Sequence, residues 1–135
     1  MKRIAGFGGI IWILFILTGC SVILKTEGER TAVEYELMDL RDIPEDIQKE
    51  IAEQKAEPFQ ITYRDMEYLY IAEGYGKKEE SGYCIEITEC TQNENAIHIE
   101  AILHGPGGEG AICETEYPLY VVRTAYTKKH VIFEE

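Results

Sequence analysis

Apolar and polar side chains alternate along most of the chain from residue 31 onward, and this alternation limits the fold more than any other feature. A period of two residues is typical of half-buried β-strands, because successive side chains point to opposite faces of a sheet. The stretch 68–72 is apolar on both faces, which indicates a central strand. The pattern predicts strands at 31–37, 59–63, 68–72, 83–90, 96–104, 111–123 and 130–133.

One segment has the periodicity of a helix instead. Ile43, Ile47 and Ile51 are spaced four residues apart and form one apolar stripe. Asp42 is the expected N-cap, and Pro58 prevents the helix from continuing, because the residue before a proline avoids helical geometry. We therefore expect an α+β fold class, in which one amphipathic helix packs on a mostly antiparallel β-sheet that is either open or barrel-like.

The segments 83–90 and 96–104 are expected to pair as a hairpin. Ile87 of the first segment faces inward, and so do Ile99 and Ala101 of the second. Ile87 must therefore lie opposite one of these two residues, which requires a turn with an odd number of residues. The polar segment 92–95 supplies the turn residues.

The first residues have the features of an export signal. Lys2 and Arg3 precede a long uncharged run, and Leu17-Thr-Gly-Cys20 resembles the bacterial lipobox, in which the cysteine receives diacylglycerol and becomes the first residue. We expect a signal peptide at 1–19, a lipidated tether at 20–30 and a single domain at 31–135. Cys20 would then anchor the protein to a bacterial cell membrane, facing outside the cytoplasm. The alternative is that the run remains as a membrane-spanning helix.

The chain is strongly acidic, with a formal net charge of −12. The acidic residues are spread along the sequence rather than gathered in runs. This charge argues against nucleic acid and against an anionic membrane surface as partners. It is typical of an exported protein that is kept soluble by its charge.

The segment Gly74-Tyr-Gly-Lys-Lys-Glu-Glu-Ser-Gly82 has a glycine spacing that suggests phosphate binding. A phosphate cradle places its glycines before the N-terminus of a helix, but Tyr83 begins a segment with strand periodicity. Two lysines in this segment are also balanced by two glutamates. We therefore expect Gly74 and Gly82 to shape a connection between strands, with no nucleotide bound.

The spacing of the histidines and carboxylates does not predict a metal site or a catalytic centre. His98, Glu100 and His104 share one strand face, but the two histidines are too far apart along a strand to bind one ion, so all three are expected to face solvent. Cys84 lies near His104 in one allowed register, but its acidic surroundings do not favour a reactive thiolate. We expect a protein that is not an enzyme and has no cofactor.

Three cysteines follow Cys20. Cys84 and Cys90 share one face of a regular strand and are about 20 Å apart, which is too far for a bond. Cys113 has the parity of inward-facing residues in the last long strand. We therefore expect no intramolecular disulfide, and three free thiols.

Short motifs follow one another between residues 57 and 134: Tyr68-Leu-Tyr-Ile71, Gly74-Tyr-Gly76, Ser81-Gly-Tyr-Cys-Ile85, Asn95-Ala-Ile97, Gly105-Pro106 and Tyr117-Pro-Leu-Tyr-Val-Val122. Together they resemble the C-terminal domain of the PrcB (protease complex subunit) family, with Ser81 in place of a glycine that the family usually has. The resemblance implies an exported, often lipid-anchored protein. The family's namesake is an accessory lipoprotein of a secreted subtilisin-like protease complex, so the resemblance implies an accessory role and supplies no catalytic residues.

The aromatic composition indicates where a partner binds. Nine tyrosines against four phenylalanines suit a contact surface, because tyrosine combines a large contact area with a polar tip. Pro118 suggests a sheet edge that accepts a partner's strand. The alternatives are a small-ligand or peptide-binding module, or a protease inhibitor whose reactive loop is 105–110. We expect another exported protein, a protease by resemblance, to dock on Gly74, Tyr75, Gly82, Tyr83, Tyr117, Pro118 and Tyr120.

Overall fold

A computed structural model describes residues 29–114 and 116–134. The chain divides into two compact units, Met1–Thr31 and Ala32–Glu135, and the second contains nearly all of the described residues. The expected signal peptide, Cys20 and most of the tether lie outside the described residues. Within the described ranges, no helix is both long enough and apolar enough to cross a membrane.

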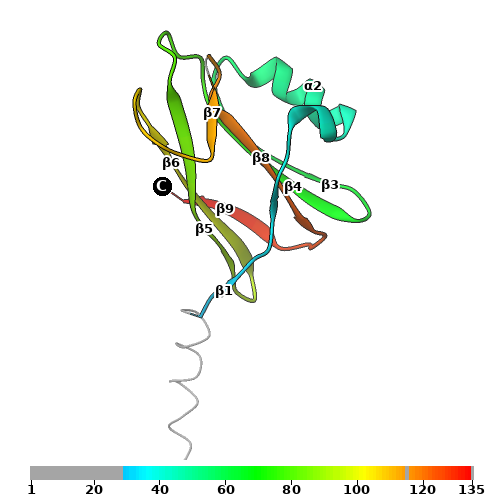
Figure 1. The fold of residues 1–135 in the computed structure, drawn as a ribbon. Helices are drawn as coiled ribbons and strands as arrows, with labels where there is room; N and C mark the ends of the chain where they lie inside the picture. Colours follow the sequence, from blue (N-terminus) through cyan, green and yellow to red (C-terminus); the bar gives the residue numbers. More distant parts are fainter. Residues whose placement is uncertain (1–28, 115, 135) are drawn as a thin grey trace, which may run out of the picture. The chain divides into compact units, whose positions relative to one another are not determined.

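The described strands form two sheets, and one α-helix lies on one of them (Figure 1). Sheet 1 has the order β1-β5-β6-β9, with β7 also paired to β5, and sheet 2 has the order β2-β8-β4-β3. The elements are β1 (Thr31–Ala32), β2 (Glu36–Leu37), the 3-10 helix η1 (Leu40–Asp42), α2 (Glu45–Gln54), β3 (Pro58–Arg64), β4 (Tyr68–Tyr75), β5 (Tyr83–Gln92), β6 (Ala96–His104), β7 (Ile112–Glu114), β8 (Leu119–Ala125) and β9 (His130–Glu134).

This architecture confirms the α+β class with a predominance of β-structure. The strand pairs within sheet 2, and those of β5 with β6 and β7, are antiparallel, whereas β6 and β9 are parallel. The described sheets are not closed into a barrel, so the barrel-like option is not confirmed.

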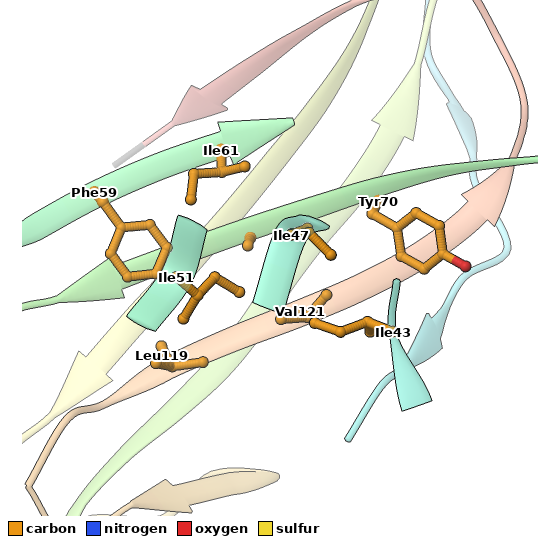
Figure 2. Close-up of a cluster of buried hydrophobic side chains, with 9 residues drawn as sticks. Ile43, Ile47, Ile51, Phe59, Ile61, Tyr70, Leu119 and Val121 are labelled. Atoms are coloured by element: carbon orange, nitrogen blue, oxygen red, sulfur yellow. The ribbon is translucent and has the colours of Figure 1, made fainter. Parts of the chain in front are cut away.

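Helix α2 packs on sheet 2 through the predicted apolar stripe. Ile47 and Ile51 of the helix, together with Ile43 just before it, are buried against β3, β4 and β8 (Figure 2). The predicted N-cap is wrong: Asp42 ends η1, and Pro44 holds the N-cap position with an extended backbone, so the helix begins at Glu45. The strand side chains in this cluster are Phe59, Ile61, Tyr70, Ala72, Leu119 and Val121.

A second core lies between the two sheets. Leu69 and Ile71 of β4, and Tyr120 and Val122 of β8, pack there with residues of sheet 1, while the residues that alternate with them contact α2. Each large aliphatic side chain buried in this way stabilises the fold by about 1.5–3 kcal/mol. The burial of β4 on both faces confirms that 68–72 is a central strand.

The hairpin of β5 and β6 has one of the two predicted registers, with Ile87 opposite Ala101. The predicted odd-numbered turn is wrong: Gln92 pairs with Ile97, which leaves an even number of residues between them, and a β-bulge between Ile87 and Glu89 brings Ile87 opposite Ala101. A bulge inserts one residue and so reverses the facing of those that follow. Cys90 therefore packs in the second core, next to Ile85, while Cys84 points to the opposite face. The expectation that Cys84 and Cys90 share a face is wrong.

Cys84 and Cys113 form a disulfide, with an S–S distance of 2.13 Å, so the expectation of no intramolecular disulfide is wrong. The segment 111–123 is not one strand: β7 pairs with β5 in sheet 1, whereas β8 belongs to sheet 2. This break places Cys113 directly opposite Cys84 in the register of β5 and β7, and on the exposed surface rather than inside. Cys90 is a free, buried thiol.

Candidate functional site

A groove of about 410 Å³ runs along the first residues of β8. One wall comes from the segment between β2 and η1, the other from β7 and the residues that precede β8, and Lys55 at the end of α2 also borders it. We call it the β8 groove, defined by Leu37, Met38, Asp39, Leu40, Lys55, Ile112, Glu116, Tyr117, Leu119, Tyr120 and Val121.

The groove is open because β2 is very short. Its two residues pair only with Val122 and Arg123 of β8, and the Met38 N–H then donates to the Val121 carbonyl before the chain turns into η1. On this side of β8, no described strand pairs with Leu119 or Tyr120, although β4 pairs with both on the other side. β8 is thus an inner strand whose beginning has one uncovered edge.

The walls of the groove are apolar and partly exposed. The side chains of Leu37 and Leu40 are 45% and 39% exposed, and the Lys55 ammonium lies 4.5 Å from the centre of the Tyr117 ring in a cation–π contact. At the rim, hydrogen bonds from Arg41 lower the pKa of the Asp39 carboxyl, which stays charged. Such a surface combines apolar contact area with fixed charges at its border.

The structure brings the two predicted docking segments together. The Tyr75 N–H donates to the Pro118 carbonyl over 3.0 Å, and the Lys78 N–H donates to the Glu116 carbonyl over 2.8 Å. The Gly74–Tyr83 connection therefore lies beside the segment that leads into β8. Of the predicted residues, Tyr117 and Tyr120 line the groove.

Two of the predicted docking residues belong to the core. Tyr120 is buried between the sheets, where its hydroxyl donates to Glu73 Oε1 over 2.9 Å. Burial, followed by the nearby Glu73 carboxylate, raises the pKa of Tyr120 well above its usual value. Pro118 is also buried. Their side chains therefore do not offer an exposed contact surface.

The predicted glycines have structural roles. A Cβ atom on Gly74 would lie 2.2 Å from the ring of Phe59, so only glycine fits there. Gly82 has a φ of 97°, in the left-handed region that favours glycine. Tyr83 is half-buried, and the Lys78 ammonium lies 5.6 Å from the centre of its ring.

The histidine-bearing face differs from the expectation. His98 is buried rather than facing solvent, and its Nδ1 atom lies 2.9 Å from Oε2 of Glu134 on the adjacent β9. His104 pairs separately with Glu86 over 3.0 Å. Cys84 lies opposite His104 in the register of β5 and β6, but it is bonded to Cys113. In the described part of the chain, no group of three or more such side chains is placed to hold a metal ion.

The sequence reasoning missed the apolar walls of the groove. The periodicity places Leu37 at the end of a strand and Ile112 in a long strand, and it assigns no role to Leu40. The one signal in the sequence is the set of three apolar residues Leu37, Met38 and Leu40, just before the helix. It does not by itself indicate that these side chains remain exposed.

One comparison with known proteins gives a match, in the central part of the chain. Residues 69–125 match the family model described as PrcB C-terminal. A search of curated proteins found no match, and neither did a search of solved structures. The matched range runs from β4 through β8 and so includes the Gly74–Tyr83 connection, the disulfide and the floor of the β8 groove. This match confirms the resemblance to the PrcB C-terminal family found in the sequence motifs, over residues 69–125.

Proposed function

We propose that this protein is a non-catalytic accessory subunit that docks another exported protein, a protease, at the membrane surface. The PrcB C-terminal match supports an association with a protease complex. In this proposal, diacylglycerol on Cys20 anchors the protein on the outer side of the membrane, and the domain carries the docking site. Its acidity favours a partner with a basic surface.

One observation carries the choice of the β8 groove as the docking site. The exposed Leu37 and Leu40 side chains lie beside the uncovered edge of Leu119 and Tyr120. Exposed aliphatic side chains next to open strand backbone can bind both the side chains and the main chain of a partner. Protein interfaces use this combination of an apolar centre and a charged rim.

Affinity purification of the full chain from native membranes tests the proposal. The double variant Leu37→Asp, Leu40→Asp should lose its co-purifying protein, because it places charges in the apolar walls. Met66→Asp is the matched control: Met66 is 95% exposed, in the turn between β3 and β4 and outside the groove. If the double variant keeps its partner while remaining folded, or if Met66→Asp loses it equally, the groove is not the docking site.

A further inference from the structure

The edge of β6 is only partly covered. β9 pairs with Ala96–Glu100 of β6 and ends at Glu134. Beyond this point, no described strand pairs with residues 101–104 on the β9 side, whereas β5 covers the opposite side as far as His104. Open strand edges of this kind are templates for an added strand.

A hollow of about 690 Å³ lies beside this uncovered edge. Ala101 and Ile102 of β6 and Glu134 of β9 line it from sheet 1. Gln60 and Glu73 line it from sheet 2, where β3 is the last strand. The hollow thus opens between the two sheets, next to backbone that is free to pair.

The charged side chains that line the hollow, Glu73 and Glu134, are both carboxylates. Glu73 is only 8% exposed, and its two oxygens accept hydrogen bonds from the Tyr120 hydroxyl over 2.9 Å and from the Gln60 amide over 3.4 Å. Glu134 also contacts His98, over 2.9 Å.

We propose that residues 101–104 accept an extended segment of a partner protein that carries lysine or arginine. Alternate side chains of the added strand would face the hollow and the outer surface in turn. The inward cation would then meet the carboxylates. A second copy of this chain is a poorer occupant, because its net charge is −12 and its hollow is equally acidic. The site is separate from the β8 groove.

Fluorescence anisotropy with short labelled peptides and the full chain tests this proposal. A peptide of alternating valine and lysine should bind, and raising the salt concentration should weaken it. A valine–glutamate peptide should not bind. A valine–lysine peptide with alternate amides N-methylated should also fail, because strand addition needs its N–H groups.

Two variants locate the site on the protein. Ile102→Lys should lower the affinity for the valine–lysine peptide about tenfold or more, because the new lysine repels the like charges of the peptide at the edge. Ile132→Lys is the matched control, since Ile132 is 43% exposed, compared with 44% for Ile102, and lies on β9 opposite His98 rather than beside residues 101–104. Glu73→Gln should reduce both the affinity and its salt dependence while keeping an acceptor for Tyr120, and its melting temperature reports whether it folds.

Several results would overturn the proposal. These are equal binding of the lysine and glutamate peptides, no binding of either, or equal weakening by Ile102→Lys and Ile132→Lys. Self-association of the chain that Ile102→Lys disrupts would identify a second copy as the occupant instead. If Leu37→Asp, Leu40→Asp loses peptide binding, the peptide binds in the β8 groove and not at residues 101–104. The proposal for this site and the proposed function can therefore be refuted separately.

Discussion

Gly74 lies directly beneath the ring of Phe59, its partner in the register of β3 and β4. An alanine Cβ would be 2.2 Å from Phe59 Cε2, so Gly74→Ala must displace a ring that packs against α2. Overpacking of this kind costs about 1–3 kcal/mol of unfolding free energy. Urea denaturation should show this loss for Gly74→Ala and almost none for Gly105→Ala, whose Cβ has no neighbour within 4 Å. Equal midpoints for the two variants would contradict the packing described here.

Single residues also show how far the sequence could locate the site. Tyr117 and Tyr120 are both predicted as contact residues from their aromatic rings, and both line the groove, but Tyr120 is buried. Composition cannot separate the two, because tyrosine serves in cores and in interfaces alike. Burial is decided by the strand's place between α2 and sheet 1.

At the scale of elements, the sequence predicts burial correctly where apolar residues recur at a regular spacing along a helix or strand. The isoleucine stripe of α2 and the double-sided burial of β4 were predictable from periodicity. The bulge between Ile87 and Glu89 was not, because it breaks the parity on which the facing of Cys90 was inferred. The break between β7 and β8 likewise hid the pairing of Cys84 with Cys113.

The disulfide holds β7 on β5, and β7 carries Ile112 of the β8 groove. Among Cys84, Cys90 and Cys113, only Cys90 should react with a thiol reagent in the denatured, non-reduced chain. The double variant Cys84→Ser, Cys113→Ser should lose about 2–4 kcal/mol of stability, because the bond restricts the unfolded chain. It should also weaken binding of the groove's partner, measured at a temperature where the variant remains folded. Three reactive thiols in the wild-type chain would contradict this bond.

At the scale of the whole domain, the β8 groove was not predictable because it forms only when three layers of structure pack together. The helix, sheet 2 and sheet 1 are stacked so that β8 is buried on both faces. The groove is lined by residues from four separate segments, 37–40, 55, 112 and 116–121, which only the packing of these layers brings together. The apolar–polar pattern within a segment indicates which of its residues are buried. It does not indicate which exposed residues from distant segments become neighbours.

The whole protein is also expected to be tethered to a membrane, and this prediction concerns residues outside the described range. The motif Leu17-Thr-Gly-Cys20 predicts cleavage before Cys20 and a diacylglycerol group on its thiol. Stable membrane anchoring requires more than one acyl chain, which diacylglycerol supplies. A disulfide such as Cys84–Cys113 persists in an oxidising compartment outside the cytoplasm. Intact-mass spectrometry of protein extracted from membranes should therefore find a chain that begins at Cys20, carries diacylglycerol and retains the disulfide.

Cys20→Ser should keep the signal segment uncleaved and lack the lipid. A membrane-bound wild-type chain of intact length, from Met1 to Glu135, would instead establish that the uncharged run remains as a spanning helix.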